Sequence, residues 1–229
     1  MDLQQHYSTM RTEAYRHLTQ GNVTLDPLID STEDTRRGIT LLARPPAVIT
    51  ARLEALLADF RAIEPAQYYY PASDLHITVL SIISCYSGFT LDRIDPVAYQ
   101  DAIRGIAQQT RPFRISFSGL TASPSSIIVQ GFPHDSGLEQ LRNQVRNFFS
   151  GSGLQQSIDQ RYSIQTAHST VLRFKSPLRD ASALLENLRL YEQEAFGSFD
   201  VDTLELVYND WYQRAGNTIL LEKYPLQHQ

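Results

Sequence analysis

Cysteine is nearly absent from this sequence of 229 residues, in which Cys85 is the single example. One thiol cannot form an intramolecular disulfide or a cysteine-cluster zinc site, so disulfide scaffolds and zinc fingers are excluded and a reducing compartment is favoured. No apolar run approaches the roughly 18 residues that span a bilayer, and the first residues lack the basic start and apolar stretch of a secretory signal. We therefore expect a cytoplasmic protein with no membrane partner.

An excess of basic charge is also lacking. Lys and Arg number 20 against 25 Asp and Glu, which gives a formal net charge of -5. Such a chain has no overall positive field to hold a long polyanion, so we expect no duplex DNA partner, although a local pocket can still bind one phosphate. The 42% hydrophobic content is that of a globular protein, and the length suffices for a core without a metal or disulfide.

Hydrophobic spacing predicts alternating strands and helices from residue 38 onward. Residues 1–37 are polar and rich in turns, apart from a short helix expected before Gly21, and we interpret them as an N-terminal extension to a domain of residues 38–229. Short β-branched or alternating runs predict strands over 39–42, 75–83, 113–117, 125–129, 169–174, 201–207 and 218–221. Helical spacing predicts helices over 49–60, 95–108, 138–148 and 182–191. Hairpins, short connections and two similar halves predict an α+β fold with mainly antiparallel sheets.

The most informative feature is a pair of nearly identical pentapeptides, His-Ile-Thr-Val-Leu from residue 76 and His-Ser-Thr-Val-Leu from residue 168. Both fall on predicted strands, where side chains alternate between the two faces. His76 and Thr78 therefore share one face, as do His168 and Thr170, while the residues between them point the other way. Each strand is expected to offer an imidazole and a hydroxyl on a rigid element.

Two such faces brought together would form a site for proton transfer at phosphorus. The unperturbed pKa of imidazole is near 6.5, so one ring can accept a proton while the other donates one, and threonine hydroxyls can donate to phosphate oxygens. The alternative for each histidine is a hydrogen-bonded structural residue, but the duplication favours a functional pair. A third His-x-Thr sequence, beginning at His17, is followed by Gln20 on a polar segment, and we interpret it as a coincidence.

Other catalytic arrangements are less well supported. No metal site is expected, because zinc requires a third ligand and usually a close histidine pair that the sequence lacks. A Ser/His/Asp triad would lack the Gly-x-Ser-x-Gly elbow. Cys85 is a candidate nucleophile beside a histidine, but a lone cysteine at the end of an apolar strand is more typical of an inert core position.

The two motifs resemble those of the 2H phosphoesterase superfamily, which includes LigT-like 2′-5′ RNA ligases and cyclic phosphodiesterases. The resemblance covers residues 38–229: Gly38–Phe60 is similar to the family's opening strand and helix, and Leu204–Leu226 is similar to its closing hairpin. It implies a bilobal, pseudo-twofold α+β fold with two mainly antiparallel sheets flanked by helices and with the motifs facing across a central groove. It also implies that His76 and His168 act as acid and base, in an order set by the substrate.

The same resemblance implies that Thr78 and Thr170 hold the phosphate. Arg173 stands five residues after His168, where LigT-like members often have an arginine. Strand alternation places Arg173 opposite His168 unless the strand ends or bulges, so phosphate binding and a surface salt bridge both stay open.

Nucleobases in such grooves commonly stack on aromatic side chains. Tyr86, Trp211 and Tyr212 are therefore candidate substrate-binding residues, with core packing the favoured alternative for each.

These observations predict a hydrolase that needs no metal or cofactor. The expected activity is that of a phosphodiesterase acting on a 2′,3′-cyclic phosphate or a 2′-5′ bond in a nucleotide or short oligonucleotide. One alternative is a non-catalytic module that binds AMP or CMP. Another is a mutarotase-type proton shuttle on a sugar, against which the duplicated threonine argues. The N-terminal extension is open to three roles, namely covering the groove, shaping substrate choice or mediating dimerisation, and the oligomeric state is not predicted.

Overall fold

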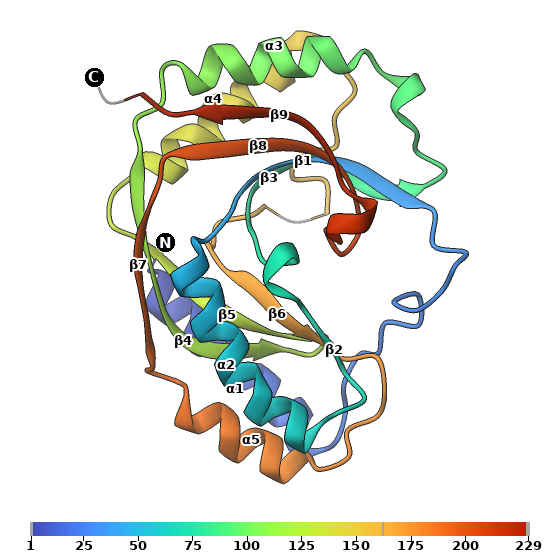
Figure 1. Cartoon of the computed structure of the whole chain (residues 1–229), viewed down its shortest axis with the longest axis vertical. Helices are drawn as coiled ribbons and strands as arrows, with labels where there is room; N and C mark the ends of the chain where they lie inside the picture. Colours follow the sequence, from blue (N-terminus) through green and yellow to red (C-terminus); the bar gives the residue numbers. More distant parts are fainter. Residues whose placement is uncertain (1, 162, 228–229) are drawn as a thin grey trace.

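The computed structural model describes residues 2–161 and 163–227. Two antiparallel sheets form its framework (Figure 1). The four-stranded sheet has the order β3-β1-β8-β9, with β1 (Arg36–Ala43), β3 (Ile77–Ser87), β8 (Thr203–Asp210) and β9 (Ile219–Pro225). The five-stranded sheet has the order β2-β6-β5-β4-β7, with β2 (Tyr68–Tyr69), β4 (Phe113–Ser123), β5 (Ser126–Pro133), β6 (Ser169–Arg173) and β7 (Ala195–Val201).

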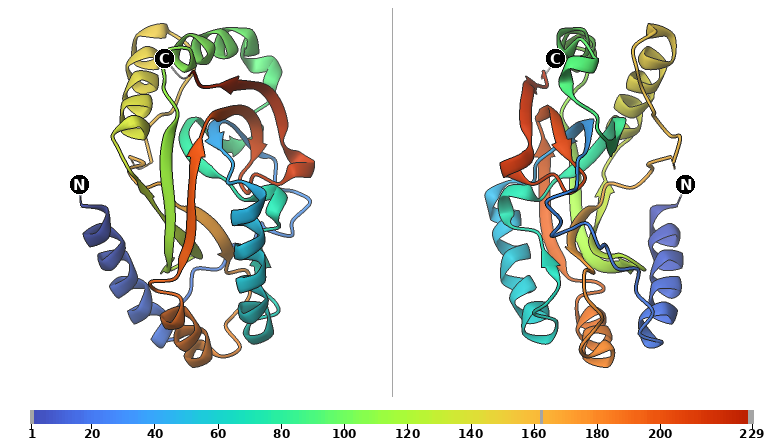
Figure 2. Two further views of the ribbon diagram at one scale, coloured as in Figure 1. Left: turned by 60° about the vertical axis from the view of Figure 1, so that its left-hand side comes forward. Right: turned by 90° about the vertical axis from the view of Figure 1, so that its right-hand side faces the viewer.

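Helices flank both sheets (Figure 2). On the four-stranded sheet, α3 (Pro96–Ala107) packs against β8 and β9, and α4 (Gly137–Ser152) packs against β3 and α3. On the five-stranded sheet, α1 (Leu3–Thr19) packs against β4, α2 (Ala47–Ile63) packs against β7, and α5 (Ala181–Leu190) contacts both helices. Three 3-10 turns complete the fold, η1 (Ala72–Asp74), η2 (Leu91–Arg93) and η3 (Ala215–Asn217). The predicted bilobal α+β fold is therefore confirmed.

The predicted helices form for identifiable local reasons. Asp95 caps the N-terminus of α3, where its side chain accepts a hydrogen bond from the amide of Val97, and Pro96 occupies the first turn, where its missing N–H costs nothing. Gly153 caps the C-terminus of α4 in the left-handed conformation, with φ of 73°. The hairpins β4-β5 and β8-β9 also form as expected.

Each sheet takes strands from both halves of the chain, which the local pattern did not reveal. The strand predicted over 201–207 is divided at Asp202: β7 ends at Val201 in one sheet, and β8 begins at Thr203 in the other (Figure 1). The earlier part of β7 was not predicted, because its alternation is interrupted at Gly197, which has φ of 120°. This crossing of the chain between sheets couples the two lobes covalently.

The N-terminal extension contains a longer helix than the short one expected. The helix α1 has 17 residues and buries Tyr7, Ala14 and Leu18 against the lobe that carries β4. No residue of α1 is among the described residues that line the cavity containing His76 and His168. The extension therefore contributes to the core of one lobe. In the described residues, no helix is both long and apolar enough to cross a membrane.

The packing of α1 predicts the effect of a core substitution. Leu18 is 0% exposed, so Leu18→Ala should lower the free energy of unfolding by about 2–5 kcal/mol if α1 unfolds together with the rest of the chain. Urea denaturation followed by circular dichroism measures this change. Leu190→Ala, at a helical leucine that is 75% exposed, is the matched control and should change stability by less than about 0.5 kcal/mol. Equal, small effects of both substitutions would show that α1 is dispensable to the core.

Candidate active site

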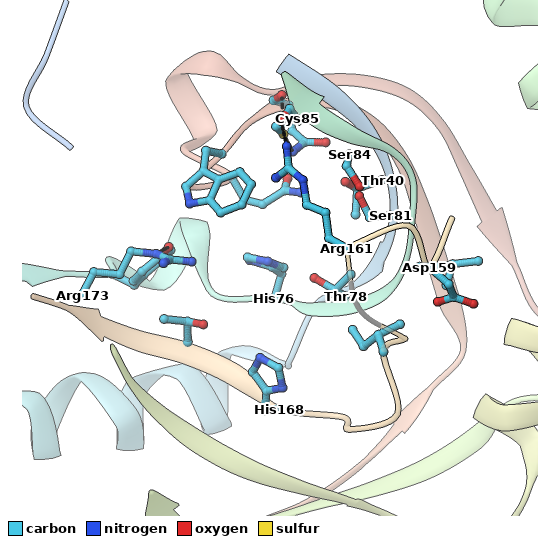
Figure 3. Close-up of a pocket in the computed structure, with 17 residues that line it drawn as sticks. Thr40, His76, Thr78, Ser81, Ser84, Cys85, Asp159, Arg161, His168 and Arg173 are labelled. Carbon is cyan, nitrogen blue, oxygen red and sulfur yellow. Dashed lines mark hydrogen bonds between the residues drawn. The ribbon is translucent and has the colours of Figure 1, made fainter. Parts of the chain in front are cut away.

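The two motif strands bring the predicted catalytic side chains to one cavity. The strands β3 and β6 each begin at the residue that follows the motif histidine. His76, Thr78, His168 and Thr170 all line a cavity of about 150 Å³ (Figure 3). His76 and His168 approach it from opposite sides, each from its own sheet.

A β-bulge occurs at the same place in both motifs. In the register with β1, Thr78 and Leu80 lie opposite consecutive residues, so Val79 is an extra residue in β3. The register between β5 and β6 shows the same shift, with Val171 as the extra residue. A bulge reverses the alternation of side chains beyond it. The pseudo-twofold relation between the motifs therefore extends to this irregularity.

The bulge in β6 turns Arg173 to the same cavity as His168, which strict alternation would prevent. Its Nε donates a hydrogen bond to the hydroxyl of Tyr70 at 2.8 Å. Within the described part of the chain Arg173 forms no salt bridge, so the surface ion pair that the sequence left open is absent there. Ser81 stands at the matching position after the first motif and also lines the cavity.

The ring of His76 is held by a backbone carbonyl. Its Nδ1 lies 2.7 Å from the carbonyl oxygen of Asp74, which can only accept, so Nδ1 carries a proton and Nε2 is left for a ligand. Asp74 is itself fixed, because its side chain accepts hydrogen bonds from the amide of Ala215 at 3.0 Å and from the hydroxyl of Ser73 at 2.8 Å. Burial lowers the pKa of His76 to about 4.

The ring of His168 has a hydroxyl partner instead. Its Nδ1 lies 2.6 Å from Oγ1 of Thr166, which can donate to the neutral ring or accept from the charged ring. Burial, followed by the charges of His76 and Arg142, lowers the pKa of His168 to about 4. Both rings are therefore neutral at pH 7 in the free protein, and an anion bound between them would raise both pKa values.

Among the three aromatic candidates for substrate binding, the structure places Trp211 on the cavity wall. The guanidinium groups of Arg36 and Arg161 lie 4.9 and 5.2 Å from the centre of its ring, respectively. Arg161 also lines the cavity, and Figure 3 shows its side chain above the two histidines.

Tyr86 and Tyr212 are not among the described residues that line the cavity, which corrects the expectation for both. The ring of Tyr86 packs against Phe89, with centroids 5.3 Å apart, and its hydroxyl accepts from Gln155. Tyr212 is 1% exposed, and its hydroxyl accepts a hydrogen bond from Arg36. Core packing accounts for these two tyrosines.

Cys85 lines the cavity but lacks the character of a nucleophile. Burial raises the pKa of its thiol to about 12, so the thiol stays protonated at neutral pH. Its Sγ lies near Asn209, at 3.5 Å from Nδ2. Across residues 2–161 and 163–227, no three histidine, cysteine or acidic side chains gather as metal ligands would.

Several cavity residues escaped sequence reasoning, namely Arg161, Ser81, Asn209 and Gln213. The segment that contains Arg161 lies outside any helix or strand, so no periodicity marks it. Ser81 lies five residues after His76, just as Arg173 lies five residues after His168, so the comparison of the two motifs could have identified it. Asn209 lies near the C-terminal end of β8 and Gln213 lies beyond the strand, and no local signal distinguishes either from a surface residue.

Two antiparallel sheets that each present one histidine and one threonine to a shared cavity define a 2H phosphoesterase. The sequence profile of the 2′-5′ RNA ligase superfamily matches residues 45–212, and the chain belongs to this family. A search of curated proteins found no significant match.

Solved structures show the same fold. TT0787 of Thermus thermophilus superposes with a TM-score of 0.59 and 17% identity over 82% of this chain and 97% of that one. E. coli LigT in complex with 3′-AMP superposes with a TM-score of 0.52 and 16% identity, over 84% of this chain and 99% of that one. The protein ATU0111 of Agrobacterium tumefaciens superposes with a TM-score of 0.53 and 16% identity, over 91% of this chain and 98% of that one. At these identities the likeness concerns the fold.

The low pKa values of the two histidines predict a loss of stability in acid. The unfolded chain binds protons at His76 and His168 below about pH 6.5, whereas the folded protein does so only near pH 4. The free energy of unfolding should therefore fall as the pH decreases from 6.5 to 4. A His76→Asn/His168→Asn variant should lose less stability over this window, as measured by urea denaturation at pH 7, 6 and 5. Parallel slopes for the two proteins would contradict the burial of neutral imidazoles.

Proposed function

We propose that this protein is a metal-independent phosphodiesterase that hydrolyses a 2′,3′-cyclic phosphate or a 2′-5′ phosphodiester in a nucleotide or short oligonucleotide. One observation carries the proposal. His76 and His168 line the same cavity from opposite sides, and the Nδ1 atoms of both are already engaged, so the two Nε2 atoms are available to one ligand. Thr78 and Thr170 lie beside them as hydroxyl donors.

The hydrogen-bond partners of the two rings favour one assignment of roles. His76 has Nδ1–H fixed by the Asp74 carbonyl, so its Nε2 accepts a proton from the attacking water as the new O–P bond forms. His168, in its protonated form, donates the Nε2 proton to the leaving ribose oxygen as the P–O bond breaks. The products are a phosphomonoester and a free hydroxyl, and the proton on His76 returns through solvent to His168.

Local charge favours an anion in spite of the net charge of -5. Arg161 and Arg173 line the cavity, and no described carboxylate lies within salt-bridge distance of either. Arginines elsewhere, such as Arg104, Arg114 and Arg146, pair with acidic side chains. Unpaired guanidinium groups are well suited to phosphate oxygens.

Relatives support a nucleotide ligand. Structures of E. coli LigT have been solved in complex with 3′-AMP, with NADP+ and with ATP. A nucleotide phosphate between the two histidines would leave its base near Trp211, where stacking on the indole would orient it.

A second candidate function is a nucleotide-binding module without turnover. It is favoured by the low pKa values of both histidines, because the general acid then holds no proton at pH 7 in the free protein. Phosphate binding restores that proton in the catalytic account, so kcat should persist to higher pH than kcat/KM. Saturable binding of AMP or CMP with no turnover of any cyclic or 2′-5′-linked substrate would favour the binding module.

Removal of either histidine tests the catalytic proposal. His76→Ala and His168→Ala should each lower kcat on a 2′,3′-cyclic nucleotide by roughly 10²–10⁴-fold, because each removes an acid or a base. Product formation is followed by chromatography, with EDTA added to show that turnover is retained without free metal ions. His17→Ala is the matched control, since it lies in a third His-x-Thr sequence on α1 and should keep full activity. Wild-type activity in either active-site variant would rule the mechanism out.

The position of Trp211 predicts an effect on binding. Trp211→Ala should raise KM about 10-fold to 100-fold, which is the effect expected for loss of base stacking, with kcat changed much less. Steady-state kinetics with a cyclic nucleotide separates the two constants. Tyr86→Leu, at an aromatic residue outside the cavity lining, should leave KM near the wild-type value. Equal KM values for all three proteins would remove Trp211 from the substrate site.

A further inference from the structure

The buried face of α4 contains an arginine among apolar residues. Arg142 is 3% exposed and lies on the same stripe as Leu138, Leu141 and Val145, which face the core. Burial of a guanidinium group costs free energy unless its donors are fully used. The partners of Arg142 therefore indicate why a cation occupies this position.

The three hydrogen bonds that Arg142 donates to described residues all go to backbone carbonyls, two of them in β3 and one in the segment just before β6. Its Nε donates to the carbonyl of Val79 at 2.8 Å, and its Nη2 donates to that of Thr78 at 3.0 Å. The same Nη2 also donates to the carbonyl of Thr166 at 2.7 Å. Thr78 and Val79 form the bulge of the first motif, and Thr166 holds the ring of His168. One side chain thus joins the first motif strand to the segment that leads into the second.

Arg142 has no acidic partner within the described residues. Burial lowers its pKa to about 10, so it remains a cation at neutral pH. Its charge is among those that disfavour protonation of His168 in the free protein. The same charge would favour an anion in the cavity.

The N-terminal helix α1 contacts the strand that packs against the segment before β6. The hydroxyl of Tyr7 donates to the carbonyl of Gly131 at 3.2 Å and accepts from its amide at 3.3 Å. A side chain at position 131 would collide with the carbonyl of Ala167, so this glycine permits the close packing. The segment before β6 is therefore held by α4 at Thr166 and packed at Ala167 against Gly131, which α1 contacts through Tyr7.

We propose that Arg142 is a positioning residue for the two-histidine site. Its guanidinium group fixes the bulge of β3 against the segment that precedes β6, and so sets the separation of His76 and His168. It also places a buried positive charge behind the bound phosphate. The inference rests on the proposed phosphodiesterase activity, which assigns the two histidines their roles.

Substitutions of Arg142 separate positioning from bulk stability. Arg142→Met keeps a side chain of similar length but removes the charge and the three hydrogen bonds. Arg142→Lys keeps the charge but loses the planar guanidinium group, whose two nitrogens bind the three carbonyls together. Arg52→Met is the matched control, because Arg52 also donates to a backbone carbonyl, that of Phe196, but is exposed and outside the cavity lining. The full chain is used throughout, and the folded fraction is measured by thermal denaturation.

For Arg142→Met we expect kcat on a 2′,3′-cyclic nucleotide to fall roughly 10-fold to 100-fold per folded molecule, as small displacements of reacting groups do. Histidine side-chain NMR titrations should show a higher pKa for His168, because the substitution removes one of the positive charges that lower it. The other groups that lower this pKa, namely His76, Arg173 and His6, are unchanged in the variant. Arg142→Lys should also lower kcat while shifting the pKa of His168 less. Arg52→Met should match the wild type in both measurements.

A kcat per folded molecule within twofold of wild type in Arg142→Met, with an unchanged His168 titration, would overturn the inference. If that variant does not fold, wild-type kcat in Arg142→Lys overturns it instead. If the wild type turns over no substrate, the proposed activity fails separately. In that case the role of Arg142 is tested by 3′-AMP binding and by the His168 titration. The inference then requires that Arg142→Met bind 3′-AMP more weakly than the wild type and that its His168 have a higher pKa.

Discussion

Two strands from separate sheets must face one cavity for this site to exist, and much of the chain serves that requirement. The strands β3 and β6 each carry one cavity threonine and are each directly preceded by one cavity histidine. The run from β7 into β8 passes from one sheet to the other, so neither lobe can move far from its partner. The hydrogen bonds of Arg142 cross the same boundary at the level of the motifs. The geometry of the histidine pair is therefore a property of the whole fold.

The electrostatic character of the cavity differs from that of the chain. The net charge is -5, yet Arg161 and Arg173 line the cavity, and they and the buried Arg142 form no salt bridge among the described residues. Asp159, which also lines the cavity, is paired with Arg146. Burial, together with the charge of Arg173 at both rings and of Arg142 at His168, holds both imidazoles neutral in the free protein. A phosphate would offset the positive field and allow one ring to take up a proton. In the catalytic account, substrate binding and formation of the general acid are thus one event.

Much of this site follows from local sequence. The repeated His-x-Thr-Val-Leu pattern predicts the four central side chains, because alternation on a strand is a local property. Arg173 could not be placed in the same way, since the bulge at Val171 that turns it to the cavity appears only in the pairing of β6 with β5. Trp211 and Tyr212 are adjacent and equally aromatic, and only tertiary packing separates the one on the cavity wall from the one in the core.

The most direct test of the central claim is a crystal structure of the protein with 3′-AMP bound. The account predicts the phosphate between His76 and His168, with the Nε2 atoms of both rings within hydrogen-bond distance of its oxygens and the hydroxyls of Thr78 and Thr170 beside it. A nucleotide bound elsewhere on the protein, with both Nε2 atoms left free of phosphate, would contradict the account.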